Sequence, residues 1–153
     1  MNKILTKKIK INGRFLFVDN NLHLFHVGSG ISFIYKGKSF KLHLNFKDKK
    51  GFIYVIIDRD YDHKEKILID GDKVIEYKLS SDKKHHIDVI KGNEELDNTL
   101  VVKDLILDGN LLDYDHKYSQ KIKVYGDSTI AGFGILKKGG NEASIFENDG
   151  VED

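Results

Sequence analysis

Residues 40–46 read Phe40-Lys41-Leu42-His43-Leu44-Asn45-Phe46, with apolar side chains at every even position and polar side chains at every odd position. Successive side chains of a β-strand point to opposite faces of the sheet, whereas helical side chains repeat every 3.6 residues. This alternation therefore predicts a strand with one face in a hydrophobic core and the other in water.

Similar short runs lie on both sides of this stretch. They are rich in Val, Ile, Phe and Tyr, and the chain has no proline and 14 glycines, a composition that favours strands over helices. The predicted strands cover residues 9–11, 15–18, 22–27, 30–35, 40–46, 52–58, 66–69, 74–79, 86–91 and 99–107. With no helical period before residue 120, they predict a mainly β fold, an antiparallel jelly-roll-like β-sandwich.

Turn signals separate the predicted strands. Each supplies a glycine, aspartate or asparagine, the residues that tolerate a positive φ. They lie at residues 36–38, 49–51, 70–72, 91–93 and 108–110. The Asp70-Gly71 pair is the strongest hairpin signal among them.

Length and composition limit the architecture and the partners. A chain of 153 residues has room for one ordinary domain and at most a fragment of a second. Hydrophobic residues make up 40% and charged residues 32%, which is typical of a soluble globular protein. The net charge of +1 is spread along the chain and no apolar run approaches about 18 residues, so neither nucleic acid nor a membrane is an expected partner. The oligomeric state is left open.

The first eleven residues carry four lysines, at positions 3, 7, 8 and 10, but no apolar stretch of the kind that follows in a signal peptide. We therefore expect no secretion signal and a cytoplasmic location by default, with an extracellular location left open. The sequence contains no cysteine, so disulfides and thiolate metal sites are excluded.

The pattern changes near residues 113–120. Beyond that segment, residues 122–125 form a short β-branched run that leads directly into Gly126-Asp127-Ser128, the strand-to-turn entry of an open α/β sheet. We therefore expect two domains: a jelly-roll-like β-sandwich at residues 1–118, and an incomplete α/β domain, its first strand and nucleophile loop, at residues 119–153.

A Gly-Asp-Ser at a strand end resembles the SGNH hydrolases, also called Gly-Asp-Ser esterases and lipases. A β-sandwich of about 115 residues placed directly before it resembles carbohydrate esterase family 2, the two-domain acetylxylan esterases. Further segments occur in the order of that family's amino-terminal half: residues 13–14, 27–31, 55–58, 89–91, 94–95 and 124–134.

The resemblance implies roles for three residues. Ser128 matches the nucleophile, which attacks an ester carbonyl after a histidine has taken its proton, and its backbone N–H would be one oxyanion donor. Gly126 permits the tight turn, and Asp127 would orient the loop. No cofactor or metal is implied, and the substrate would be an acetylated carbohydrate.

The rest of the implied machinery belongs to segments after residue 153: a second oxyanion glycine, an oxyanion asparagine and a late histidine. All seven histidines of this chain precede Ser128, the reverse of the family's order, and we assign none of them to catalysis. We expect the chain to be the amino-terminal part of a carbohydrate O-deacetylase and to be nearly inert by itself.

Two other interpretations remain open. Gly-Asp-Ser also occurs in ordinary loops and helix N-caps, so the chain could be a noncatalytic carbohydrate-binding or interaction sandwich. It could also be a degenerate relic of an esterase.

Three other groups of residues suggest sites, and for each a structural role is the better interpretation. His23 and His26, like His85 and His86, point to opposite faces of a strand, which predicts solvated histidines and no metal chelation. Three aspartates, at positions 58, 60 and 62, fit a solvated hairpin better than a calcium loop. Four tyrosines, at positions 35, 54, 61 and 77, fit core or rim positions better than a sugar-stacking platform.

Overall fold

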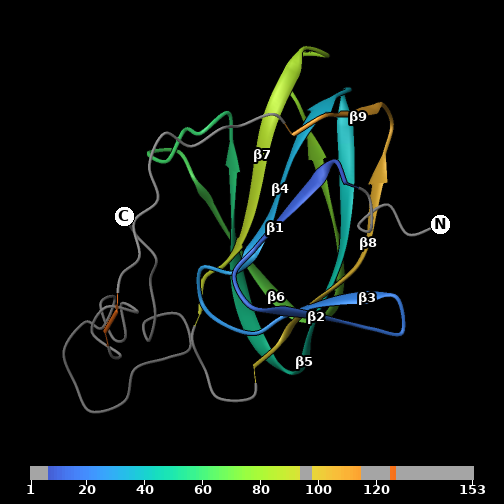
Figure 1. The fold of residues 1–153 in the computed structure, drawn as a ribbon. Coiled ribbons are helices and arrows are strands. Elements are labelled where there is room, and N and C mark those ends of the chain that lie inside the picture. The colour runs from blue at the N-terminus through green and yellow to red at the C-terminus, as the bar shows by residue number, and fades with distance from the viewer. Residues whose placement is uncertain (1–6, 94–97, 115–124, 127–153) are drawn as a thin grey trace.

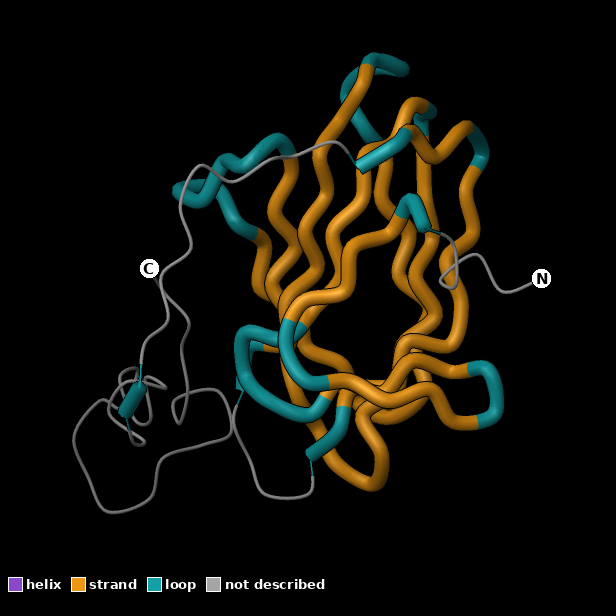
Figure 2. Tube along the Cα trace, viewed as in Figure 1, coloured by secondary structure: helices purple, strands orange, loops and turns teal. Residues whose placement is uncertain are grey.

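The computed structural model describes residues 7–93, 98–114 and 125–126, apart from the side chains of residues 48 and 49. Nine strands and no helix lie in these ranges (Figures 1 and 2). The strands are β1 (Ile9–Asn12), β2 (Phe15–Val18), β3 (Asn21–Leu24), β4 (Gly30–Lys36), β5 (Ser39–Ile57), β6 (Glu65–Lys78), β7 (Lys84–Lys91), β8 (Leu100–Leu107) and β9 (Asn110–Leu112). Among the described residues, no helix is long and apolar enough to cross a membrane.

All strand pairs are antiparallel, and their order along the hydrogen-bonded path is β1-β4-β7-β5-β8-β3-β2. In addition, β6 pairs with β5 and β9 pairs with β4. Residues 40–46 of β5 pair with β8, whereas residues 53–57 pair with β7. The two ends of this one long strand thus belong to the two layers of the sandwich (Figure 1). The predicted mainly β, antiparallel sandwich is confirmed.

The β5–β6 hairpin corrects two predicted turns. Residues 49–51 and 70–72 do not end strands, because β5 and β6 run through them and pair with each other on both sides. The register shifts between Asn45, opposite Asp72, and Lys50, opposite Asp70, and Gly71 has a φ of +65° at that point. An irregularity of this kind bends both strands, which is how a long hairpin turns the corner between two sheets.

The other turn signals are confirmed at residues 36–38, between β4 and β5, and at residues 108–110, between β8 and β9. The signal at residues 91–93 marks the end of β7. The three-residue strand β9 was not predicted from the sequence, because it is too short to show an alternation. Of residues 119–153, only 125 and 126 are described, so the expected second domain and its boundary stay predictions.

The core lies between the two layers and contains the even positions of the opening stretch. Leu42 and Leu44 are fully buried, and Phe40 stacks on Tyr77 with ring centroids 5.0 Å apart. Three of the four tyrosines discussed above, Tyr35, Tyr54 and Tyr77, are buried, which confirms their structural role. Tyr61, by contrast, is 56% exposed.

A second set of buried residues lies outside this core cluster, at positions of β4, β5 and β7 that alternate with core positions. It consists of Ser32, Ile34, Phe52, Tyr54, Ile56 and Asp88. Ser32 pairs with Asp88, and Asp88 with Ile56, so these three form one row across β4, β7 and β5. Lys66 covers part of this outward face, with Nζ 4.1 Å from the centre of the Phe52 ring. The outward face of this sheet therefore carries apolar side chains along β5 and a polar pair, Ser32 and Asp88, on β4 and β7.

Candidate functional site

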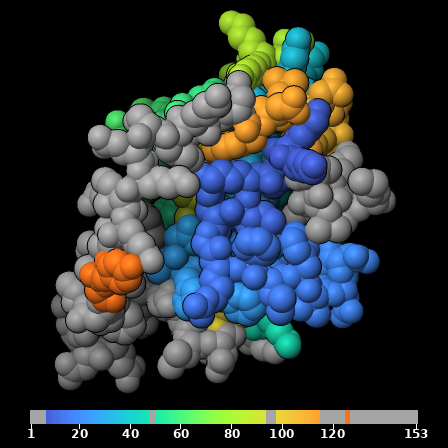
Figure 3. Space-filling view, viewed as in Figure 1, coloured from blue at the N-terminus to red at the C-terminus, as the bar shows by residue number. Residues whose placement is uncertain are grey.

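Of the three site residues predicted from the resemblance, the structure describes Gly126. Asp127 and Ser128 lie outside the described residues. Gly126 is exposed, next to Tyr125, which is 77% exposed, and the two lie at the surface in the view of Figure 3 (orange). The nucleophile, turn and oxyanion roles therefore stay predictions.

The structure shows instead a cleft of about 330 Å³ on the outward face of β1, β4 and β7. Its lining combines polar, charged and aromatic side chains with some aliphatic surface, and these residues come from segments scattered along the chain. The lining residues are Asn12, Gly28, Ser32, Arg59, Tyr61, His86, Asp88, Ile90 and Tyr114. Small-molecule sites in proteins typically occupy about 300–1,000 Å³, so this cleft is at the small end of that range.

The floor of the cleft is set by strand register. Ser32 pairs with Asp88 on one side and with Lys10 on the other, so small and polar side chains follow one another across β7, β4 and β1. The Asn12 side chain donates a hydrogen bond from Nδ2 to Ser32 Oγ, at 2.9 Å. This bond fixes the amide at one edge of the floor.

His86 and Asp88 are two residues apart on β7 and therefore share the outward face. His86 Nδ1 lies 3.1 Å from Asp88 Oδ2, and His86 Nε2 lies 3.3 Å from the Tyr114 hydroxyl. The Asp88 carboxylate can only accept, so it forms an ion pair with the His86 ring when that ring is protonated. Asp88, at 8% exposure, is thus a nearly buried carboxylate held in a defined pose at the floor.

The β5–β6 loop, residues 58–64, supplies Arg59 and Tyr61 and projects from one edge of the molecule (Figure 1, green). Asp58 and Arg59 have positive φ values of 55° and 61°, a conformation that costs non-glycine residues about 1–2 kcal/mol each. Within the loop, Asp60 accepts hydrogen bonds from the backbone N–H and Nδ1 of His63. The side-chain bond to His63 holds the pKa of Asp60 below its usual value.

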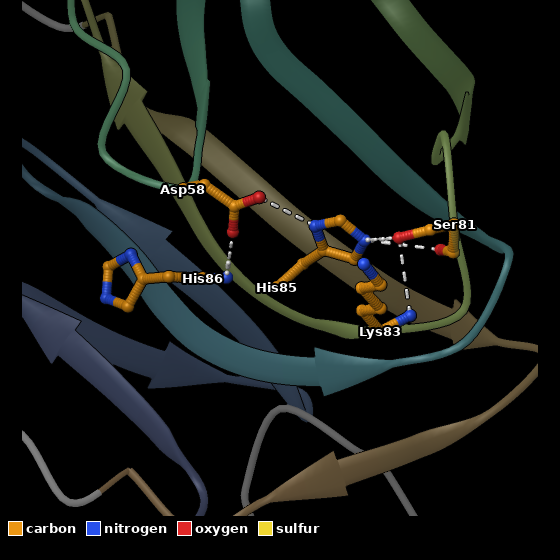
Figure 4. Close-up of polar contacts among 5 residues, drawn as sticks. All are labelled: Asp58, Ser81, Lys83, His85 and His86. Atoms are coloured by element: carbon orange, nitrogen blue, oxygen red, sulfur yellow. Dashed lines mark hydrogen bonds and ion pairs between the residues drawn. The ribbon is translucent and has the colours of Figure 1, made fainter.

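A clip of hydrogen bonds ties this loop to β7 (Figure 4). Asp58 Oδ1 accepts the backbone N–H of His86 at 2.9 Å, and Asp58 Oδ2 accepts Nδ1–H of His85 at 2.8 Å. The other ring nitrogen, His85 Nε2, lies 3.1 Å from Ser81 Oγ. The clip extends the β5–β7 ladder beyond Ile57 and compensates for the strained backbone that presents Arg59.

In this clip a carboxylate contacts Nδ1 of a histidine, and Nε2 of the same ring contacts a serine hydroxyl. A serine-hydrolase triad has its groups in the same order. However, His85 Nε2 also lies 3.2 Å from the carbonyl oxygen of Ser81, and Ser81 Oγ accepts the Lys83 N–H at 3.4 Å. Ser81 is thus part of a local turn, and the described residues that line the cleft do not include it. We interpret the clip as a structural device that positions the β5–β6 loop.

The histidine predictions are partly wrong. His85 and His86 do face opposite sides of β7, as predicted, but His85 is buried at 6% exposure and is not a solvated histidine. Its burial is tolerated because both ring nitrogens have partners. His23 is half-buried, and burial lowers its pKa. No group of three His, Asp or Glu residues in the described ranges is placed to hold a metal ion.

The aspartates at positions 58, 60 and 62 lie in the exposed hairpin loop that joins β5 and β6, as predicted. The cleft itself was not predicted. Its residues come from β1, β4, β7 and three connecting segments, and no local sequence pattern links them. The one available signal was Arg59-Asp60-Tyr61, an aromatic and a guanidinium in a predicted loop.

The described residues thus define an antiparallel β-sandwich with a polar cleft on the outward face of one sheet. Among solved structures, two carbohydrate esterases share this fold over most of the chain. A family two carbohydrate esterase from Cellvibrio japonicus matches with a TM-score of 0.81 and 23% identity, over 94% of this chain and 44% of that protein. The acetyl xylan esterase Est2A of Butyrivibrio proteoclasticus matches with a TM-score of 0.75 and 17% identity, over 96% of this chain and 41% of that protein.

A smaller protein shares the sandwich more distantly. The CBM36-1 domain of a multidomain xylanase, from the hindgut metagenome of Trinervitermes trinervoides, matches with a TM-score of 0.51 and 13% identity, over 68% of this chain and 93% of that domain. No protein-family model matches the chain, and no curated protein matches it by sequence. The resemblance to carbohydrate esterase family 2 is therefore confirmed at the level of the fold, and the chain spans less than half the length of the esterases it matches.

Proposed function

We propose that this chain is the amino-terminal part of a carbohydrate O-deacetylase, in which the β-sandwich precedes a hydrolase domain that begins near residue 119. The observation that carries the proposal is the fold match to a family two carbohydrate esterase over 94% of the chain, combined with a Gly-Asp-Ser after the sandwich. Neither a sandwich nor a three-residue motif would be specific alone. The proposal rests on the position of the motif directly after the sandwich in one chain.

In the proposed reaction, Ser128 Oγ attacks the acetyl carbonyl while a histidine removes its proton. The resulting tetrahedral intermediate then breaks its bond to the sugar oxygen, which takes the proton from the histidine, and an acetyl-enzyme remains. Water then releases acetate and restores the serine. The backbone N–H of Ser128 would stabilise the oxyanion together with donors from later segments. The histidine would also come from later segments, so the activity belongs to the longer protein.

The test compares hydrolysis of acetylated xylan by this chain and by the chain extended along its coding sequence. The extended protein is expected to release acetate, and Ser128→Ala is expected to reduce kcat by at least about 10³-fold, because the acetyl-enzyme can no longer form. Ser119→Ala is the matched control and should retain activity. An inactive extended protein, or full activity after Ser128→Ala, would overturn the proposal in favour of a noncatalytic sandwich.

A further inference from the structure

We propose that the cleft over β1, β4 and β7 binds a neutral saccharide, with Tyr61 as the stacking surface. Three residues would provide hydrogen bonds: Asn12, Arg59 and Asp88. The inference uses no residue after Tyr114, so it does not depend on the proposed esterase activity.

The chemistry of the lining matches the surface of a sugar. A pyranose ring has an apolar C–H face and a rim of hydroxyl groups that both donate and accept. An aromatic ring with a negative π-face suits the C–H face, and Tyr61, 56% exposed, lies at the cleft. In the part of the chain that the structure describes, the Tyr61 hydroxyl and the Arg59 guanidinium form no hydrogen bond or ion pair. Both groups are thus available to a ligand.

The charges favour a neutral ligand over an ionic one. The lining contains one guanidinium, Arg59, and one carboxylate, Asp88, together with amide and hydroxyl groups. Asp88 already lies beside His86, so an anion would meet a fixed negative charge, while a cation would meet Arg59. Hydroxyl groups can use both, because they donate to carboxylates and accept from guanidinium groups.

The site is built before a ligand arrives. The internal bonds from Asp60 to His63 shape the loop, and the Asp58 clip to His85 and His86 fixes its base. Less conformational entropy is then lost on binding, since the loop is already ordered. The positive φ values of Asp58 and Arg59 are thus held in place by the clip, which fixes the backbone from which Arg59 extends.

The experiment is calorimetric titration of the full 153-residue chain with cellohexaose and xylohexaose. We expect a Kd between about 1 μM and 1 mM for at least one of them. Tyr61→Ala should weaken binding at least about tenfold, since an exposed aromatic anchor is lost with little effect on folding. Asn12→Ala should weaken it as well. Phe15→Ala is the matched control, because Phe15 is an exposed aromatic of β2 that does not line the cleft, and its affinity should stay within about twofold.

Three results would overturn the inference. They are no binding of either neutral oligosaccharide up to about 10 mM, unchanged affinity after Tyr61→Ala, or tighter binding of a hexuronic acid oligosaccharide than of its neutral counterparts. Failure of the esterase proposal has a different signature, because Ser128→Ala should leave this titration unchanged.

Discussion

The contact between Tyr35 and Asp108 makes the stability of the sandwich depend on pH. The Tyr35 hydroxyl donates its one proton to Asp108 Oδ1 and lies 2.6 Å from the Ser39 carbonyl oxygen. Asp108 also accepts from the Lys38 N–H and the Ser39 hydroxyl. The hydrogen bond from Tyr35 lowers the pKa of Asp108 to about 2, and burial raises the pKa of Tyr35 to about 12. Both shifts favour the folded state at neutral pH.

Because the two pKa values shift in opposite directions, Asp108 and Tyr35 affect stability in two different pH ranges. Asp108 is ionised more readily in the folded state, so its contribution is present above about pH 4 and is lost as the pH falls towards 2. Tyr35 is harder to ionise when folded, so its contribution is present below about pH 10 and is lost as the pH rises through 12. Neither residue affects stability through titration between these windows.

We therefore predict that Asp108→Asn unfolds more easily than the wild type at pH 7 and loses less additional stability between pH 4 and 2. Urea unfolding midpoints measured across that range provide the test. Hydrogen bonds also lower the pKa values of Asp60 and Asp72, so both proteins should show some acid loss and the difference between them is the informative quantity. Asp82→Asn serves as a control, and parallel curves for Asp108→Asn and the wild type would contradict the prediction.

At the scale of the elements, two strand glycines are required for different reasons. Steric crowding excludes a side chain at Gly30, whereas a positive φ disfavours one at Gly71. Gly30, the first residue of β4, pairs with Asn12 of β1 and Ile90 of β7, and a Cβ there would lie 2.2 Å from the carbonyl oxygen of Val89. Gly71 has a φ of +65° at the bend of the β5–β6 hairpin, but nothing lies within 4 Å of its added Cβ. The first site therefore resists any side chain, whereas the second resists only residues that avoid the left-handed conformation.

We predict that Gly30→Ala costs about 2–3 kcal/mol, because the obstacle is backbone and cannot rotate away. Gly71→Ala should cost about 1–2 kcal/mol, and Gly71→Asn less, since asparagine tolerates a positive φ. Free energies of unfolding from urea titrations test this ranking. A Gly71→Ala change as damaging as Gly30→Ala would mean that the register of β4 against β7 is looser than the structure indicates.

The same elements explain what could be predicted from the sequence. Residues 40–46 were assigned correctly because period-2 alternation is a local property that burial on one face imposes. The turn at Asp70-Gly71 was wrong because the local signal, a glycine able to take positive φ, is the same for a hairpin and for a bend within a strand. Pairing with residues 45 and 50 of β5 decides between them, and pairing is tertiary information.

The candidate site was harder to predict for a related reason. Burial of His85 depends on Asp58 and Ser81, which lie 27 and 4 residues away, and no motif joins these three positions. The cleft likewise requires the register that places Ser32 beside Asp88. Ser128 was identifiable from sequence because a nucleophile motif is contiguous, whereas a binding surface on a sandwich is assembled across strands.

At the scale of the whole molecule, all nine described strands precede the proposed hydrolase segment. Among the described residues, the members of the core cluster and the side chains packed against it all lie between Ile9 and Leu111. The last described strand, β9, ends at Leu112, and Lys8 Nζ donates to the Leu111 carbonyl, so the two ends of the sandwich meet. The hydrophobic burial seen in the described residues therefore falls within residues 1–118, the first domain expected from the sequence.

We accordingly predict that a chain ending at residue 118 folds by itself. Its free energy of unfolding should lie within about 1 kcal/mol of that of the 153-residue chain, because none of the described core residues is removed. Circular dichroism and cooperative urea unfolding provide the measurements. A chain ending at residue 107 is the matched comparison: it loses β9, which pairs with β4, and Leu111, which packs on the core, and should be less stable. Failure of the 118-residue chain to unfold cooperatively would show that residues beyond the sandwich contribute to its core, and would contradict the domain boundary on which the esterase proposal rests.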